Sequence, residues 1–521
     1  MKKRRLIDLS KEAFQILRLF QKPLRDNLPP RISKNLFEDL ELSKFLNRFF
    51  EHPEKYLTCD PEIIRERNEI CASLLRNEPL FQALQNFHDT SQPLLKTSSN
   101  ETSEPIQIVR NMIGVKLFYD AASALARVID DSPNPLYVFT SLSGEIKELL
   151  RKRYPLDFMN LWDLYANGVE KTFSMSYKIR FTSDLAIDAV ALTSVNHRRY
   201  KKTTLINYVK NVSEPMRVDS ILSLIPGSQP EEGRLTNRYG EPGVLARFSY
   251  SIRQMLAAQT IVSENQLTIM EKGIADDIRE FINELYFALG MAKYAKTITA
   301  CPYRTCFAEI RDSKERLLFI RHMIHPVLAE REGIVANDIE IGNGHELILL
   351  GGLNRGGKTV FLRTAGSAQL LFQIGLPIPA ESAKISPASG IFSVFSKNED
   401  NEIYQGKLER ELTEMRDIVS LLDADSLFLG NEPITGTSPK ESYFLSLESL
   451  CLLKAKRARG IWISHLYALF DDVERLDGLG FGSRFICMRT DSASAFEKRN
   501  FLIVRGVPEK YSGAKEVYAQ Q

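Results

Sequence analysis

The chain has 521 residues, of which 44% are hydrophobic and 26% charged, and a formal net charge of +2. This length exceeds what a single hydrophobic core serves, so more than one domain is expected. The near-neutral charge does not by itself indicate a nucleic-acid partner. No stretch approaches the roughly eighteen apolar residues of a membrane span, so we expect a cytoplasmic protein with no membrane partner.

Up to about residue 325 the apolar residues follow a mostly helical pattern. Within the proline-free stretch 267–295 they recur at steps of three and four, which predicts a long amphipathic helix. The residues that carry this pattern are Ile274, Ile278, Phe281, Leu285 and Leu289. Residues 90–105 are rich in Ser, Thr and Pro and are interpreted as a linker, and residues 226–243, rich in Gly and Pro, as a loop.

Basic residues occur in short runs although the overall charge is balanced. The runs lie at 2–5, 151–153, 198–202 and 454–459. For any single run, a solvated face is favoured over a set of phosphate contacts.

After His325 and Pro326 the pattern changes to short apolar runs separated by polar or helical stretches. The runs at 347–350, 427–429 and 460–463 are bounded by glycines and charged residues. Such alternation predicts an α/β domain with a largely parallel sheet over residues 326–521.

The strongest motif directly follows the first of these runs, in the sequence LILLGGLNRGGKTVFLR. Gly352, Gly357, Lys358 and Thr359 have the spacing G-x-x-x-x-G-K-T of a phosphate-binding loop. Glycines let backbone N–H groups surround phosphates, the lysine neutralises their charge and the threonine hydroxyl ligates Mg²⁺. The predicted nucleotide-binding residues are Gly352, Leu353, Asn354, Arg355, Gly356, Gly357, Lys358 and Thr359.

A second polar group follows the apolar run at 427–429. Asn431 and Glu432 stand where an Asp-Glu pair normally organises Mg²⁺ and polarises the attacking water. His465 follows the apolar run at 460–463, a position from which a histidine can sense a γ-phosphate. The sequence therefore predicts Glu432 and His465 as catalytic residues, although His465 is equally compatible with a structural role at a strand end. Thr359 and Asn431 are the predicted, weak, Mg²⁺ ligands.

Together these motifs resemble the MutS family of DNA mismatch-repair ATPases. The resemblance continues through residues 375–380, 385–392, 408–415 and 436–438 and through the closing segment 501–517. It implies a multidomain protein in which a mostly helical core and lever region precedes a C-terminal α/β P-loop NTPase domain of the ABC-type MutS class.

The resemblance is weaker in the N-terminal half but suggests domain boundaries. Residues 49–75 look like a segment of the family's core domain, and the helix around 274–289 like its lever helix. We expect an N-terminal helical part of the core at 1–105, a core and lever domain with a truncated or absent clamp at 106–325, and the ATPase domain at 326–521. The family's N-terminal mismatch-reading domain has no counterpart in this sequence and is expected to be lacking.

Three residues depart from the family pattern inside the ATPase domain. Asn431 replaces the acid that organises Mg²⁺, and Gly406 stands at the serine that reaches the γ-phosphate of the partner subunit. Ile334 replaces the aromatic residue that stacks on adenine, so it is the predicted contact to the base. Binding of ATP and Mg²⁺ is expected to survive these changes, whereas hydrolysis is expected to be slow.

Two functions remain open on the sequence alone. The resemblance implies a homodimer, formed through the ATPase domain, that binds mismatched, branched or otherwise non-canonical double-stranded DNA under the control of ATP. The alternative is a nucleotide-binding scaffold or switch with little hydrolysis and no specific DNA role, which the changes at Asn431 and Gly406 favour.

Overall fold

The computed structural model describes residues 19–20, 29–95, 105–153, 174–181, 187–196, 276–342, 346–353, 356–396, 406–491 and 500–509. The chain divides into two compact units, one made of residues 1–19 and 79–285 and the other of residues 20–78 and 286–521. Each unit is described by itself. The predicted loop at 226–243, the expected clamp region and the basic runs at 2–5 and 198–202 lie outside the described residues.

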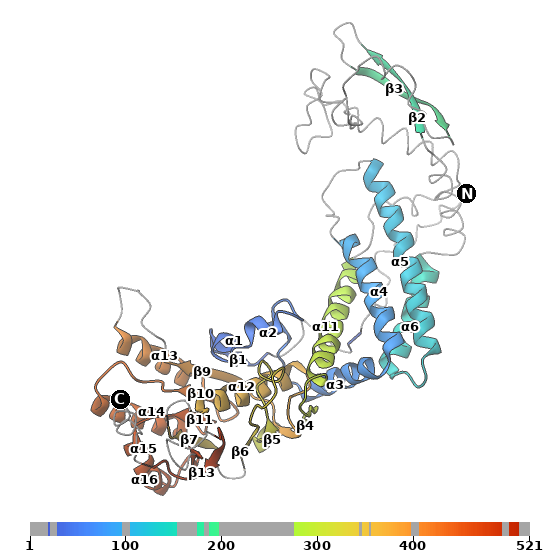
Figure 1. The fold of residues 1–521 in the computed structure, drawn as a ribbon. Helices are drawn as coiled ribbons and strands as arrows, with labels where there is room; N and C mark the ends of the chain where they lie inside the picture. The colour runs from blue at the N-terminus through green and yellow to red at the C-terminus, as the bar shows by residue number, and fades with distance from the viewer. Residues whose placement is uncertain are drawn as a thin grey trace, which may run out of the picture. The chain divides into compact units, whose positions relative to one another are not determined.

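In the part of the first unit that the structure describes, helices are accompanied by one antiparallel hairpin (Figure 1). Its helices include α4 (Glu78–Leu95), α5 (Pro105–Asp131) and α6 (Tyr137–Arg153), and its hairpin pairs β2 (Ser174–Phe181) with β3 (Ile187–Asn196). Phe87 of α4 packs edge-on against Phe118 of α5, with ring centroids 5.6 Å apart. The expected linker at 90–105 is corrected in part, because residues 90–95 continue α4 and Ser91 is fully buried there.

The long helix predicted over 267–295 is present in the described residues as α11 (Asp276–Thr299). The side chains of Phe281, Leu285 and Leu289 are at most 2% exposed, as the amphipathic pattern predicts. Its residues up to 285 belong to the first unit and the remainder to the second.

A seven-stranded sheet is the centre of the second unit, with the strand order β1-β9-β10-β11-β7-β12-β13. All neighbouring strands pair in parallel except the antiparallel edge pair β12 and β13. The strands are β1 (Arg31–Ile32), β7 (Leu347–Gly351), β9 (Gly390–Phe395), β10 (Leu427–Asn431), β11 (Arg459–Ile463), β12 (Phe485–Thr490) and β13 (Ile503–Arg505). The predicted strands at 347–350, 427–429 and 460–463 are confirmed, as is their parallel pairing.

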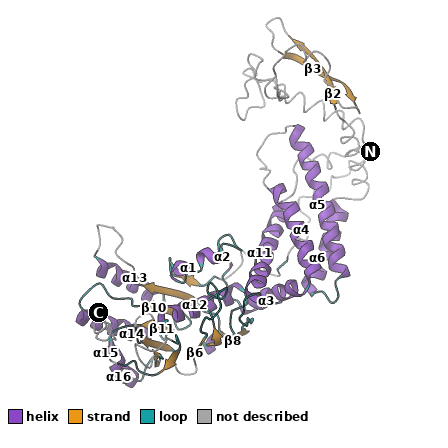
Figure 2. Cartoon of the chain, viewed as in Figure 1, coloured by secondary structure: helices purple, strands orange, loops and turns teal. Residues whose placement is uncertain are grey.

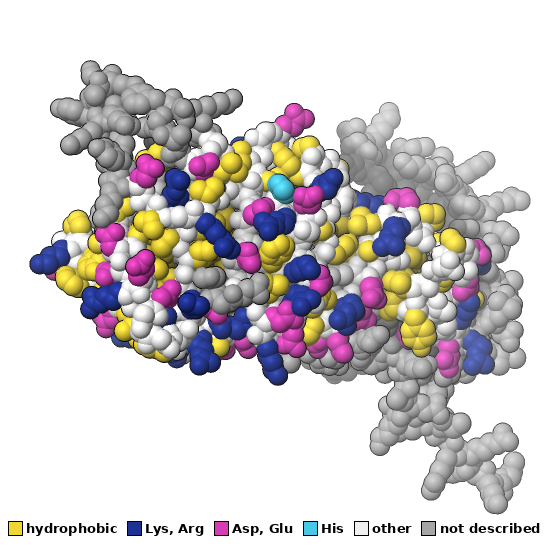
Figure 3. All heavy atoms as spheres, turned by 90° about the horizontal axis from the view of Figure 1, so that it is seen from below, with side chains coloured by type: hydrophobic (Ala, Val, Ile, Leu, Met, Phe, Trp, Pro, Cys, Tyr) yellow, Lys and Arg dark blue, Asp and Glu magenta, His cyan; other side chains and the backbone are white. Residues whose placement is uncertain are grey.

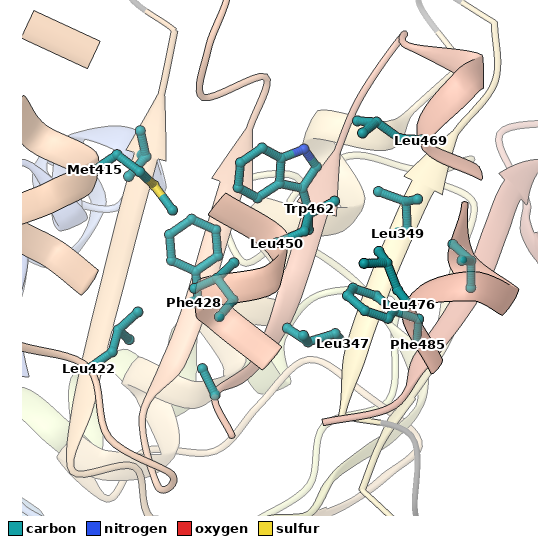
Figure 4. Close-up of a cluster of buried hydrophobic side chains, with 14 of the residues drawn as sticks. Leu347, Leu349, Met415, Leu422, Phe428, Leu450, Trp462, Leu469, Leu476 and Phe485 are labelled. Atoms are coloured by element: carbon teal, nitrogen blue, oxygen red, sulfur yellow. The ribbon is translucent and has the colours of Figure 1, made fainter. Parts of the chain in front are cut away.

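Helices cover both faces of this sheet, so its central strands are apolar on both sides. One face packs on α12 (Lys358–Ile374), and a Cβ placed on Gly366 of this helix would lie 2.6 Å from Leu429. The other face packs on α13 (Lys407–Leu421), α14 (Pro439–Ala455), α15 (Tyr467–Asp471) and α16 (Val473–Gly478). There Phe428 and Trp462 stack with ring centroids 5.9 Å apart, amid leucines of the strands and helices (Figure 4).

The second unit also contains N-terminal residues that sequence analysis placed in a separate helical domain. β1 pairs with β9, and α3 (Pro61–Arg76) places Arg67 against the end of α12, where its guanidinium donates to the carbonyl of Ile374. A second sheet, in the order β4-β8-β5-β6, lies in the same unit. Its strands are β4 (Glu309–Ile310), β5 (Leu318–Met323), β6 (Asn337–Ile341) and β8 (Ser382–Ile385).

The compact units therefore divide the chain differently from the expected ranges 1–105, 106–325 and 326–521. The reason is that described residues of 20–78 and 286–325 pack on one another, as in the stack of Tyr56 on Phe287, and also on the α/β core, where Leu40 lies against Gly366 of α12. Secondary structure is distributed accordingly, with strands concentrated in the second unit (Figure 2). Among the described residues, no helix combines the length and the apolar character that a membrane crossing requires.

Candidate functional site

The carboxyl ends of the parallel strands place the sequence-predicted polar residues at one edge of the sheet. In register, Asn431 of β10 lies beside Ile463 of β11, and Ile463 lies beside Leu350 of β7. The residues that follow these strands, Glu432, His465 and the glycine-rich loop, therefore meet at this edge. In open α/β sheets the carboxyl edge is where ligands bind.

The glycine-rich loop connects β7 to α12 and is held against the end of β12. Gly352 has φ +118°, and a Cβ on it would lie 2.3 Å from the hydroxyl oxygen of Thr490. A Cβ on Gly356 would come within 2.7 Å of the Thr490 methyl group. The backbone N–H of Leu353 donates to the Thr490 hydroxyl at 3.2 Å. Glycine is thus required at 352 and 356 by the close approach of Thr490, a residue that the motif did not single out.

The loop ends in Gly357, whose φ of +93° turns the chain into α12. Lys358 and Thr359 open this helix, so its N-terminal N–H groups and its dipole point toward the loop. Asn354 and Arg355, also predicted to bind the nucleotide, lie outside the described residues.

The Lys358 side chain points back toward the start of the glycine-rich loop. Its ammonium donates to the carbonyl of Gly352 at 3.0 Å and to that of Leu353 at 2.8 Å. Burial lowers the pKa of Lys358 to about 8, although the charge of Glu432 acts in the opposite direction. The ammonium is thus a partly desolvated cation held by two neutral carbonyls, which an anion in the loop would stabilise strongly.

Thr359 and Asn431, the two predicted Mg²⁺ ligands, lie within hydrogen-bonding distance of each other. The Thr359 hydroxyl donates to the side-chain oxygen of Asn431 at 3.3 Å. Both oxygens are neutral, and the described residues contain no cluster of three or more His, Cys, Asp and Glu that could hold a metal by itself. The donor set fits a hydrated Mg²⁺ that takes further oxygens from water and phosphate, which is the usual mode of Mg²⁺ binding.

The side chains of Glu432 and His465 are in contact, with 2.9 Å between His465 Nε2 and Glu432 Oε1. Each side chain is about one-third exposed. Burial raises the pKa of Glu432, but the hydrogen bond from His465 and the charges of His465, Lys358 and Lys407 outweigh it, so its pKa is lowered. Glu432 has φ +52°, an uncommon conformation for a non-glycine residue, and its N–H donates to the carbonyl of Ile463 at 3.1 Å.

A buried glutamate of helix α13 forms hydrogen bonds with the loop that follows Glu432. Glu411 is 8% exposed, and its carboxylate accepts hydrogen bonds from the N–H groups of Thr435 and Gly436 at 2.9 and 2.8 Å. A Cβ on Gly436 would lie 2.6 Å from the backbone nitrogen of Leu408, so the loop and the helix start are in close contact. Sequence analysis noted the segment 408–415, with the sequence LERELTEM, but not this role of Glu411.

Gly406 precedes α13 as its N-cap and is exposed. A Cβ built on it would meet nothing within 4 Å, so a serine fits there without displacing any neighbour.

Ile334, the predicted contact to the base, lies in the segment before β6. Its N–H donates to the Tyr303 hydroxyl at 2.8 Å. Three residues later, the Asn337 side chain bonds to the segment after β12, and this segment lies beside Gly357. Asn337, rather than Ile334 itself, therefore links this segment to the neighbourhood of the loop.

A parallel α/β sheet with a glycine-rich loop, a lysine and an acid at its carboxyl edge defines the chain as an α/β protein with a candidate anion-binding site. Residues 348–492, which span this edge, match the family MutS domain V. The "Endonuclease MutS2" of Ligilactobacillus salivarius is 31% identical over 232 residues, covering 43% of this chain and 28% of that protein.

Two further relatives match longer segments. The "Endonuclease MutS2" of Staphylococcus aureus is 25% identical over 62% of this chain and 40% of its own length. The "DNA mismatch repair protein MutS" of Prochlorococcus marinus is 26% identical over 81% of this chain and 48% of its own length. The chain thus spans less than half of the length of these relatives. The chain is thus similar to MutS proteins, and residues 348–492 match a domain of that family.

Proposed function

We propose that the second unit binds Mg²⁺-ATP in the glycine-rich loop and hydrolyses it slowly. The observation that carries the proposal is the geometry of Lys358, a desolvated cation that bonds to the carbonyls of a glycine-rich loop, which itself packs against Thr490. Equilibrium titration of the purified chain with ATP, with and without Mg²⁺, tests it. Micromolar binding that requires Lys358 is expected, and absence of binding would refute the proposal.

Each residue of the site has a role that its position allows. Lys358 exchanges its two carbonyl contacts for phosphate oxygens, and the loop N–H groups surround those oxygens. Thr359 and Asn431 would hold Mg²⁺, which when bound neutralises charge on the transferred phosphoryl group. Glu432 is ionised and orients or deprotonates the attacking water, and His465 holds the Glu432 carboxylate in place.

Hydrolysis is slow in this proposal because Asn431 supplies an amide oxygen where a carboxylate would hold the hydrated metal more firmly. Loss of one organising charge costs on the order of 2–4 kcal/mol in a transition state. Binding is much less affected, since the backbone, Lys358 and Thr359 provide most of the contacts to phosphate.

The second part of the proposal is a homodimer formed through residues 326–521 and tightened by ATP. Its support is the exposed start of α13 at Gly406, which Glu411 couples to the loop after Glu432, so that a nucleotide bound in a partner subunit could act on both. Sedimentation velocity at micromolar concentration, with and without ATP, is the test. A monomer at saturating ATP would contradict this part alone.

The third part is binding of double-stranded DNA of mismatched or branched structure, controlled by ATP. Its support is the similarity to MutS proteins rather than surface charge. In the run at 454–459, the side chains of Lys454 and Arg459 are at most 1% exposed, and Lys454 donates to the carbonyl of Ser483. These two cations therefore do not form part of a solvated face. On the face drawn in Figure 3, basic and acidic side chains are interspersed.

Asn431 and Gly406 also favour a second candidate function, a nucleotide-dependent scaffold or switch without a DNA role. Salt-dependent binding to linear, mismatched and branched duplexes, with and without ATP, separates the two. Phosphate contacts give a linear fall of log affinity with log salt. ATP binding without any ATP-dependent DNA binding would favour the scaffold.

A further inference from the structure

Phe501 is an exposed aromatic residue beside the glycine-rich loop. Its side chain is 45% exposed, and its backbone has φ +54°, a left-handed conformation that is a genuine outlier for a bulky residue. Strained residues of this kind cost on the order of 1–3 kcal/mol and cluster at functional sites, where the surrounding structure holds them in place. Neither the exposure nor the strain contributes to the packing of the core.

The strained conformation is held by an amide clamp from β6. Asn337 Nδ2 donates to the carbonyl of Phe501 at 3.2 Å, and the N–H of Ile503 donates to Asn337 Oδ1 at 2.8 Å. The N–H of Asp491 donates to the carbonyl of Leu502 at 2.8 Å, and on the N-terminal side of Phe501 the Asn500 Nδ2 donates to the carboxylate of Asp491 at 3.0 Å. Both flanks of Phe501 are therefore fixed, and its ring is presented on a rigid backbone.

The clamp places this ring at the entrance to the phosphate loop. A Cβ built on Gly357 would lie 3.7 Å from both Cβ and Cδ1 of Phe501, so the ring edge lies over the last glycine before Lys358. A ligand whose phosphates occupy the loop must extend its remaining part past this point. Ile334, predicted from the sequence as the contact to the base, offers an aliphatic side chain with no π face.

We propose that Phe501 is the platform on which the nucleobase stacks, and that it makes the site selective for purine nucleotides. This inference rests on the proposed nucleotide-binding function and assigns the base-recognition residue within it. An aromatic face stacks on any base but overlaps most with the two-ring purines, and a ring held on fixed backbone loses little entropy on binding. The strain at Phe501 is thus the cost of directing the ring toward the ligand rather than toward the core.

The test compares ATP, CTP and inorganic tripolyphosphate as ligands of the full chain, by calorimetric or competition titration. For Phe501→Ala, we expect ATP affinity to fall about tenfold, the size of one base-aromatic stack, with tripolyphosphate affinity unchanged and the preference for ATP over CTP reduced. Phe501→Trp should keep ATP affinity, and its indole fluorescence should change on addition of ATP but not of tripolyphosphate.

Leu502→Ala is the matched control, because Leu502 is exposed in the same segment (38%) and should leave all three affinities unchanged. Phe501→Gly removes both ring and strain, so it should raise the melting temperature while lowering ATP affinity. Equal losses for ATP and tripolyphosphate in Phe501→Ala, or no loss for ATP, would overturn the proposal. If instead the unchanged protein binds neither ligand, the proposed nucleotide site itself fails.

Discussion

The carboxyl ends of strands β7 and β10 lie at the same edge of the sheet. The residues that follow β7 are those expected for phosphate binding, whereas the residues that follow β10 include one departure from those expected for hydrolysis. After β7, the close approach of Thr490 explains the glycines at 352 and 356, and Lys358 is a desolvated cation without a carboxylate hydrogen bond. After β10, the acid Glu432 is in place, but Asn431 supplies a neutral oxygen beside Thr359. Under our proposal, the residues that bind nucleotide are therefore complete, whereas the residues that promote hydrolysis are weakened at Asn431.

The largest effect is expected on ATP affinity, when the lysine of the glycine-rich loop is removed. Lys358→Ala should lower ATP affinity by a hundredfold or more, because charge-assisted hydrogen bonds to phosphate have no substitute in the loop. The fold should persist, since the ammonium bonds only to loop carbonyls. Titration of the folded variant measures this, with circular dichroism as the control. ATP affinity equal to that of the unchanged protein would remove the basis of the phosphate-loop assignment.

The next largest effect is expected on the ATPase rate, when the acid that position 431 lacks is restored. Asn431→Asp should raise the steady-state ATPase rate about tenfold or more, in line with the cost of one missing organising charge. If Gly406 also limits turnover, then the single change will have little effect and Asn431→Asp combined with Gly406→Ser will be required. Gly406→Ser is sterically free, because its Cβ meets nothing within 4 Å. Rates of these variants at saturating Mg²⁺ distinguish the two outcomes.

A smaller effect, on both stability and ATP affinity, is expected at Thr490, which contacts the glycine-rich loop. Thr490→Val keeps the shape of the side chain but removes the acceptor for the Leu353 N–H. Leaving one donor unpaired costs about 1–3 kcal/mol, so we expect a lower melting temperature and a few-fold weaker binding of ATP. Thr490→Ser retains the hydroxyl and is the matched control. A Val variant as stable and as tight as the Ser variant would show that Thr490 only fills space.

The pH dependence of ATP binding should reveal the desolvated lysine, with an effect that is small near pH 8 and grows only above it. Phosphate favours the charged form of Lys358, whose pKa in the free protein is about 8. Below that pH the lysine is already protonated and affinity is constant. Above it, binding must take up a proton, so affinity falls with rising pH, by at most tenfold per unit. Glu432, with its lowered pKa, remains ionised throughout this range.

Titrations between about pH 7 and pH 10, in buffers of different ionisation enthalpy, measure both the slope and the proton uptake. Affinity that is flat across this range would mean that Lys358 is not the desolvated contact to phosphate.

The sequence predicts the parallel strands and the glycine-rich loop well, because both depend on local signals. Apolar runs bounded by glycines mark β7, β10 and β11, and the loop motif fixes its own position after β7. The two-residue strand β1 could not be predicted, since Arg31 and Ile32 are a strand only by pairing with β9. Likewise, the Ser and Thr content of 90–95 suggested a linker, but burial of Ser91 in α4 overrides that composition.

The residues of the site that sequence analysis did not find are those whose roles depend on contacts between distant parts of the sequence. Thr490 supports the loop from 137 residues away in sequence, and a lone threonine carries no local signal. Phe501 becomes noticeable only through its exposure and its positive φ. Glu411 could have been suspected from its position in LERELTEM, but its bonds to Thr435 and Gly436 require the fold. The roles of Glu432, His465, Ile334 and the Mg²⁺ ligands stay predictions.

The central claim, intact binding with weakened hydrolysis, is tested most directly by a single-turnover experiment with protein in excess over ATP. Bound nucleotide is isolated at successive times and analysed for ATP and ADP, in the unchanged protein and in Asn431→Asp. We expect both proteins to bind the ATP with similar affinity. The bound nucleotide should stay ATP about tenfold longer in the unchanged protein. Conversion to ADP at the same rate in both proteins would contradict the account.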